Sequence, residues 1–348
     1  MIKNREDEIE ILNRAIKAVK EVAGLDIQVK KIGHNLNNVN VIVRVEGVEE
    51  PLFVEVKRWA AHANLGAIIN QITNLPGTGL LVADHINPIM GEKLRHENVQ
   101  YIDNAGNAYI NMPNIYVFVK GNKPTTKTKT PKDATGIAFG TAGLRVIFAL
   151  LCNPELTNEP YRKIAEEAGV ALGTIAKVFE DLKVMNFLFE RKTTKTRQLT
   201  NEEELFKRWV EHYPLKLKPK LFLGEFVAGE ANWWKDCEVK NYKGVWGGEV
   251  AAAIKTRYMT PQITTIYLPE GQKYKLIQNE KLKKAREWDT IKNNTVKLYN
   301  KFWSGAQKEE LAPNILIYAD LIATADTRNL EVADKIFRDD INGFITQT

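Results

Sequence analysis

The sequence predicts a multidomain protein with an N-terminal α/β domain, a central helical segment that ends in a β-hairpin, and a C-terminal α+β domain. A chain of 348 residues is longer than one hydrophobic core usually organises. The run Lys120–Thr135 contains five lysines among threonines and prolines and lacks apolar periodicity, as linkers do. A second break, rich in proline and lysine, lies at Tyr213–Lys220. These two breaks divide the chain into three folded parts.

We therefore predict an α/β domain at 1–121, a linker at 122–135, a central domain at 136–213 and an α+β domain at 214–348. The net charge of +6 favours an anionic partner such as nucleic acid. Cys152 and Cys237 form no CxxC pair, which argues against a zinc ribbon and favours a reducing compartment. Because the sequence shows neither an export signal nor a membrane span, we expect a cytoplasmic protein without a membrane partner.

The N-terminal domain is expected to hold a mixed sheet with helices packed on its faces. Apolar residues recur at helical spacing from Ile9 to Val19, and β-rich and helical stretches then alternate. The expected elements are strands at Val39–Val45 and Leu52–Val56, a helix at Leu65–Asn74, a strand at Gly79–Ala83, a helix at Pro88–Glu97, and strands at Gln100–Ile102 and Ala108–Phe118. The order α-β-β-α-β-α-β-β implies a layered α/β fold.

A Glu-x-Lys pair marks one of these strands. Glu55 and Lys57 share a face because strand side chains alternate. Together with the element order, the pair resembles the PD-(D/E)XK site of restriction-endonuclease-like proteins, in which the carboxylate helps to hold Mg²⁺ and the lysine assists the water or the phosphate. Gln71, on the following helix, is similar to a glutamine that many members keep beside the site. A competent site would therefore use Glu55, Lys57 and Gln71, with Glu55 as the metal ligand.

The aspartate that this motif requires on the preceding strand is missing. Its equivalent is Asn40 or Asn38, and a neutral amide offers a hard cation an oxygen but no charge. We therefore expect a nuclease-like fold without activity and without a cofactor. A DNA endonuclease that uses Mg²⁺ remains the alternative.

The central domain has the pattern of a winged helix-turn-helix. Helices are expected at Ala142–Leu151 and Tyr161–Ala168, with Gly169 in the turn, and the stretch Val170–Leu182 can place apolar residues in a small three-helix core. After Asn186, two β-prone pieces surround a basic tip. In this motif the second helix enters the major groove, and a basic wing suits phosphate contacts.

The spacing I-A-x-x-x-G-V-x-x-x-T-I between Ile164 and Ile175 is similar to the bacterial helix-turn-helix pattern. The outward positions of the second helix lack the Arg, Asn or Gln that reads base edges through paired hydrogen bonds, so affinity should exceed specificity. A role in protein contacts also remains open for this fold. The candidate DNA-binding residues are Lys163, Gly173, Thr174, Lys177, Arg191, Lys192, Lys195 and Arg197.

Two further features have structural interpretations. The hexapeptide Ile102–Asn107, IDNAGN, predicts a tight turn capped by Asp103, which we favour over a catalytic role for this aspartate. Five of the seven tryptophans lie after residue 213, and we expect most of them to fill the core rather than to stack on bases. They are Trp233, Trp234, Trp246, Trp288 and Trp303.

The stretch Gly79–Ile110, which contains LRHENVQYIDNAGN, resembles the AbiEi-type antitoxin and transcriptional-regulator family, and Val245–Pro269 and Asn314–Phe337 are similar to its C-terminal region. The resemblance implies a bacterial regulator of a type IV toxin-antitoxin or phage-defence operon that represses its own promoter. The implied partners are double-stranded DNA and a cognate toxin, and a homodimer that presents paired recognition helices would fit this role. Two alternatives remain: the nuclease, and an interaction protein that neutralises a toxin without binding DNA.

Overall fold

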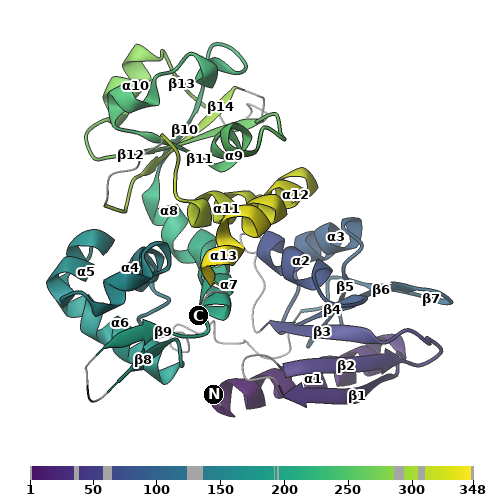
Figure 1. The fold of residues 1–348 in the computed structure, drawn as a ribbon. Helices are drawn as coiled ribbons and strands as arrows, with labels where there is room; N and C mark the ends of the chain where they lie inside the picture. The colour runs from purple at the N-terminus through teal and green to yellow at the C-terminus, as the bar shows by residue number, and fades with distance from the viewer. Residues whose placement is uncertain are drawn as a thin grey trace. The chain divides into compact units, whose positions relative to one another are not determined.

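The computed structural model describes residues 2–34, 39–57, 65–123, 136–191, 193, 196–285, 294–304 and 310–345. The chain forms two compact units, Met1–Lys132 and Asp133–Thr348, which are treated separately below (Figure 1). Most of the linker expected at 122–135 lies outside the described residues. Within the described part, no helix is both long and apolar enough to cross a membrane.

The first unit contains a seven-stranded sheet in which the strands follow one another in chain order, from β1 to β7. β3, β4 and β5 run parallel, and the other neighbours pair antiparallel. The elements are α1 (Ile2–Ala23), β1 (Ile27–His34), β2 (Val39–Val45), β3 (Leu52–Lys57), α2 (Leu65–Thr73), β4 (Gly79–Ala83), α3 (Pro88–His96), β5 (Gln100–Asp103), β6 (Ala108–Met112) and β7 (Ile115–Val119).

The predicted mixed sheet is confirmed, with two differences. β1 was not expected, because its sequence IQVKKIGH places two adjacent lysines inside the apolar pattern. Its pairing with β2 shifts register between Val29 and Lys31, so the irregular sequence is accommodated by an irregular ladder. The single strand expected at Ala108–Phe118 is two strands, because the chain turns between them at Asn114, where φ is +68°.

Helix α1 covers one face of this sheet. Leu12 and Val19 are buried in a cluster with residues of β2 to β6, including Val54 and Leu80. Because side chains alternate along a strand, Glu55 on β3 points to the opposite face. Figure 1 shows α2 and α3 on that opposite face. The Glu-x-Lys pair therefore lies on the side of the sheet that carries α2.

The second unit begins with helices and a short hairpin. Its elements up to residue 212 are α4 (Thr141–Cys152), η2 (Pro154–Asn158), α5 (Tyr161–Ala168), α6 (Leu172–Val184), β8 (Leu188–Glu190), β9 (Arg197–Leu199) and α7 (Glu202–His212). The helices expected at Ala142–Leu151 and Tyr161–Ala168 are present. Gly169 ends α5 with φ +61°, the left-handed conformation that glycine adopts without strain.

A five-stranded sheet follows, in the order β11-β12-β14-β10-β13, with β12 and β14 parallel. Its elements are η3 (Tyr213–Leu217), α8 (Lys218–Leu221), β10 (Phe222–Val227), η4 (Trp233–Lys235), η5 (Val239–Tyr242), β11 (Val245–Gly247), α9 (Gly248–Thr256), β12 (Ile263–Leu268), α10 (Lys273–Asn279), β13 (Lys283–Lys284), β14 (Thr295–Asn300), α11 (Asn314–Ile322), α12 (Thr327–Ile336), η6 (Phe337–Ile341) and α13 (Asn342–Ile345). The domain boundary predicted after Tyr213 falls at the start of η3, which leads from α7 directly into α8. The four-part division of the chain stays a prediction.

One buried carboxylate connects helix α7 to this sheet. Asp320, on α11, is only 3% exposed and accepts hydrogen bonds from the hydroxyl groups of Tyr213 at 3.1 Å and Tyr267 at 2.8 Å. Lys218 on α8 places its Nζ 2.8 Å from the same carboxylate. Tyr213 follows α7 directly, and Tyr267 lies on β12. Asp320 thus joins η3, α8, β12 and α11.

Burial and charge keep this cluster in one protonation state. Burial raises the pKa of Tyr213 and Tyr267 well above the ordinary value, and the negative charge of Asp320 raises it further, so both phenols stay protonated donors. Burial alone would lower the pKa of Lys218, but the Asp320 carboxylate more than offsets this and the pKa ends above its ordinary value. The lysine therefore stays charged beside the carboxylate.

Replacing Asp320 with alanine should lower the free energy of unfolding of the second unit by about 3–5 kcal/mol, because it leaves the buried Lys218 without its partner. It also removes an acceptor from two phenols, of which only one can still donate to the other. Urea denaturation of the full chain measures this loss. Asp339→Ala is the matched control, since it breaks a surface pair with Lys335 (3.2 Å, side chains 58% and 43% exposed) and should cost less than about 1 kcal/mol. Equal losses in the two variants would contradict a special role for Asp320.

Candidate functional site

Helix α6 turns one side to the core and the other to solvent. Ile175, Val178, Phe179 and Leu182 are buried, at the spacing of one helix face. Of the candidate DNA-binding residues on this helix, Gly173 and Lys177 are exposed and Thr174 is partly exposed. The remaining exposed positions are Leu172, Ala176, Glu180 and Val184. The second helix of the predicted motif therefore has an accessible outer face.

The β8–β9 hairpin follows α6. Leu188 and Leu199 are opposite each other in the ladder and are both buried, so they anchor the hairpin to the helices. The ladder extends toward the tip, where the Arg191 amide donates to the Thr196 carbonyl at 2.9 Å. The Arg191 side chain is exposed, whereas Lys192 and Lys195 lie outside the described residues. The structure thus places an exposed arginine, Arg191, near the tip of the hairpin.

Two of the candidate cations have partners within the protein. The Arg197 guanidinium lies over the rings of Tyr161, at 5.0 Å, and Phe179, at 5.2 Å, and it donates to the Glu159 carbonyl at 2.9 Å. Lys163, about half exposed, pairs with the Glu159 carboxylate at 2.8 Å. Arg197 therefore fastens β9 to α5 and α6. A phosphate contact by either residue stays a prediction.

Glu55 and Lys57 form an ion pair on β3. The Lys57 Nζ lies 2.9 Å from Glu55 Oε1, and both side chains are partly exposed. In the β2–β3 ladder Val41 opposes Val54, so continuing the register by one residue places Asn40 beside Glu55. Only the backbone of Asn40 is described, and Asn38 lies outside the described residues.

The third candidate of this site, Gln71, lies on α2 and is partly buried. Within the described ranges, no three His, Cys, Asp or Glu side chains are grouped closely enough to hold a metal ion. The arrangement on β3 therefore provides one carboxylate, and this carboxylate already contacts a lysine.

Asp103 has the structural role predicted for it. Its Oδ1 accepts the amide hydrogens of Ala105 and Asn107 at 2.9 Å each, and its Oδ2 accepts the amide of Ile86 at 2.7 Å. The residue is fully buried, and Gly106 provides the positive φ of +80° that the turn needs. The carboxylate is thus occupied by the turn and by the Ile86 amide of another segment.

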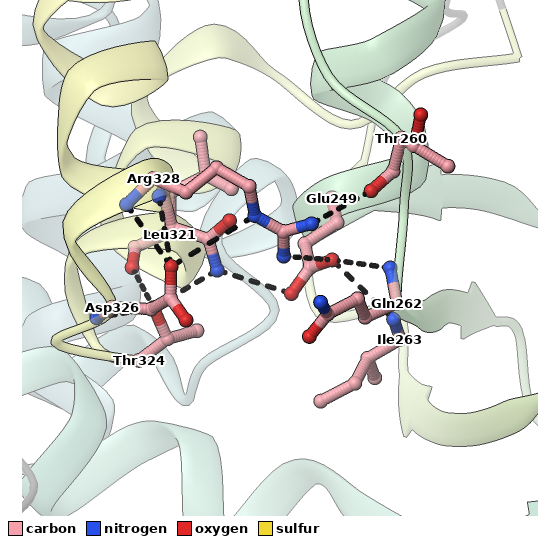
Figure 2. A network of polar contacts seen from close by, with 9 residues as sticks. Glu249, Thr260, Gln262, Ile263, Leu321, Thr324, Asp326 and Arg328 are labelled. Atoms are coloured by element: carbon pink, nitrogen blue, oxygen red, sulfur yellow. Dashed lines mark hydrogen bonds and ion pairs between the residues drawn. The ribbon is translucent and has the colours of Figure 1, made fainter. Parts of the chain in front are cut away.

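A second buried carboxylate organises the C-terminal part of the unit (Figure 2). Glu249 on α9 accepts hydrogen bonds from the Gln262 amide at 2.6 Å, from Arg328 at 3.2 Å and from Asn329 at 3.0 Å. Asp326 caps α12 by accepting the amides of Arg328 and Asn329. The network joins α9, the segment before β12, and α12.

Sequence reasoning missed Asp320 and Glu249. The signal for Asp320 was its position inside the apolar stretch NILIYADLIA, because a lone acid in a buried helix needs a partner. The expectation for the tryptophans holds in part. Trp246 is buried, and the partly exposed rings of Trp233 and Trp234 meet it edge-on, each at 6.4 Å. Trp303 is partly exposed, and Trp288 lies outside the described residues.

Comparison with known families matches the C-terminal part of this chain to a class of transcriptional regulators. Residues 198–341 match the family model described as "Transcriptional regulator, AbiEi antitoxin, Type IV TA system". The resemblance noted for Val245–Pro269 and Asn314–Phe337 is thereby confirmed, whereas Gly79–Ile110 and helices α4 to α6 lie outside the match. No curated protein and no solved structure gives a significant match.

Because Arg197 packs against two rings, we expect its replacement to destabilise the fold as well as to remove a positive charge. Arg197→Ala should lower the free energy of unfolding by about 1–2 kcal/mol, because two ring contacts and a hydrogen bond to a carbonyl disappear. Arg191→Ala removes the same charge from an exposed position and should stay within about 0.5 kcal/mol of the parent. Thermal unfolding of both variants provides the comparison. Unchanged stability of Arg197→Ala would show that its contacts are incidental.

Proposed function

We propose that this protein is a cytoplasmic DNA-binding regulator that acts as the antitoxin and autorepressor of a type IV toxin-antitoxin or phage-defence operon. The family match supports the general class. The observation that carries DNA binding is the exposed outer face of α6, followed directly by a hairpin whose tip bears the exposed Arg191.

In this proposal, α4 to α6 and β8–β9 act as a winged helix-turn-helix. A groove about 12 Å wide admits one α-helix, so α6 enters the major groove with Gly173, Thr174 and Lys177 toward the DNA. The hairpin tip, with Arg191, Lys192 and Lys195, lies along the phosphate backbone. A homodimer would present two such helices to the halves of one operator.

The C-terminal part is proposed to contact a cognate toxin protein. Its support is that residues 198–341 match a family whose description includes the word antitoxin. Toxin neutralisation without DNA binding is a competing possibility. Retention of toxin neutralisation by a chain that binds no duplex would favour that competitor.

The wing should contribute affinity for any duplex sequence. Changing Arg191, Lys192 and Lys195 together to alanine should weaken binding and flatten its salt dependence by about one unit of slope per lost phosphate contact. Fluorescence anisotropy with a labelled duplex across a salt titration measures both effects.

The control variant also removes three positive charges, but from positions of the second unit outside the hairpin. Lys207, Lys240 and Lys335, each in a surface ion pair, are changed together to alanine. This control should leave the salt slope unchanged. Equal slopes for the wing variant and the parent would remove the hairpin from the interface.

A second candidate function, DNA cleavage, is favoured by the placement of Glu55 and Lys57 on one face of β3 beside the register position of Asn40. One carboxylate rarely holds Mg²⁺ against water without further ligands. We therefore expect no cleavage of duplex or single-stranded DNA in millimolar Mg²⁺ or Mn²⁺. Asn40→Asp should raise metal affinity, measured by calorimetry, because it adds a negative charge where the motif requires one.

Cleavage by the unmodified chain would reverse this assignment if it disappeared in both Glu55→Ala and Lys57→Ala with folding intact. Asp26→Ala is a suitable control, because Asp26 is a carboxylate of the same unit that precedes β1 and forms an ion pair with Lys20 at 2.7 Å. Loss of cleavage in only one of the two test variants would point to contamination.

A further inference from the structure

The outer face of α6 carries few hydrogen-bonding side chains: the exposed Lys177 and Glu180 and the partly exposed Thr174. The sequence of the helix, LGTIAKVFEDLKV, contains no Arg, Asn or Gln. Leu172 is 53% exposed and Val184 70% exposed, with Gly173 and Ala176 also exposed. Lys177 and Glu180 are the exposed charges on this helix among the described residues, and Asp181 and Lys183 are partly buried. A face of this kind offers methyl groups and backbone rather than donors to whatever it contacts.

The small residues are not required by the fold. A Cβ built on Gly173 would meet no atom within 4 Å, so the protein itself has room for a side chain there. Because Gly173 and the exposed Ala176 have small side chains, the first two turns of α6 have a small diameter on this face. Among the described residues of these turns, Leu172 is the one large apolar side chain that projects beside them. A narrow helix with a single projecting apolar side chain can approach the floor of a groove closely.

The major groove has one apolar feature, the C5 methyl group of thymine. Guanine and adenine offer acceptors and donors that are read by Arg, Lys, Asn or Gln. Of these residue types α6 exposes Lys177, whereas Lys183 is partly buried and pairs with Glu190. Packing of Leu172 and Ala176 against thymine methyl groups would cover apolar surface on both sides and remove it from water. Lys177 can then contact a phosphate, which adds affinity without selecting sequence.

We infer that the regulator selects its operator through thymine methyl groups packed against Leu172 and Ala176, so that its preferred duplexes carry thymine at the base pairs that the first turns of α6 contact. This inference rests on the proposed DNA binding. A DNA occupant is favoured over a protein because the same segment carries the exposed cation Arg191 on the hairpin that follows α6. The lysines at 192 and 195 add to the positive charge of that tip.

The test removes the methyl groups and nothing else. Duplexes of about 30 base pairs, long enough for two half-sites one helical turn apart, are selected by the full chain from a random pool. The best binder is then resynthesised with deoxyuridine in place of every thymidine. Deoxyuridine keeps the base-pairing pattern and lacks the C5 methyl. Each contacted methyl should contribute about fourfold in affinity, the value of one buried methylene-sized group.

Three variants assign the effect to residues. Leu172→Ala should bind the thymine duplex more weakly and lose much of its sensitivity to deoxyuridine. Val184→Ala is the matched control, because it truncates another exposed apolar residue on the same helix, about three turns away. It should keep the parent's sensitivity. Lys177→Ala should weaken both duplexes equally. Circular dichroism checks folding, which should persist because all three side chains are exposed.

The outcomes separate this inference from the proposed function. Salt-dependent binding to the selected duplex with no difference between thymine and uracil would overturn the inference and leave DNA binding intact. Sensitivity that persists in Leu172→Ala, or that disappears in Val184→Ala, would overturn the assignment to the first turns of α6. If no duplex is selected at all, the proposed DNA binding fails and this inference with it, and the exposed face of α6 would then be a protein contact.

Discussion

The second unit depends on one constraint, the need of the buried Asp320 carboxylate for charge and hydrogen-bond partners. Leaving a carboxylate uncompensated inside a protein costs several kcal/mol, so the fold must bring donors to it. Those donors are Lys218, Tyr213 and Tyr267, which come from three separate elements. The position of η3 at the end of α7, and with it the path of the chain from the hairpin into the sheet, is fixed by this requirement.

Aromatic packing reinforces the same junction. The ring centroid of Phe148 on α4 lies 5.3 Å from that of Trp209 on α7 and 4.9 Å from that of Phe302, which follows β14. The Trp209 indole donates to the Leu144 carbonyl at 2.8 Å, so this large side chain is both buried and hydrogen-bonded. The helical segment and the C-terminal sheet therefore share one core. A change in the sheet that disturbed Asp320 would also disturb α7, the helix that follows the proposed wing.

The first unit uses its charges differently. The Asp103 carboxylate accepts hydrogen bonds from backbone amides of its own turn. The Glu55 carboxylate forms an ion pair with Lys57, two residues further along the same strand. Both carboxylates lie at or near the ends of parallel strands, where α/β folds usually place ligands. Among the described residues they are committed to internal partners. The role of the Glu-x-Lys pair, and of Asn40 beside it, therefore stays a prediction that the cleavage and metal-binding experiments decide.

The sequence by itself determined the elements whose information is local. Strands β2 and β4 and the ends of α4 and α5 follow from apolar periodicity, from glycine at position 169 and from turn chemistry around Asp103, because each of these acts within a few residues along the chain. The C-terminal family match also follows from sequence alone.

Only the tertiary structure decided which side chains meet. Tyr213 and Asp320 are 107 residues apart, and Arg197 reaches Glu159 across 38 residues, so no local pattern reports either contact. Sequence analysis grouped Arg197 with the cations of the wing, whereas the fold places its guanidinium over the rings of Tyr161 and Phe179. The physical reason is that contacts between charges and rings depend on the distance between the side chains in space. The packing of α5, α6 and β9 sets this distance, whereas the spacing of residues along the chain does not.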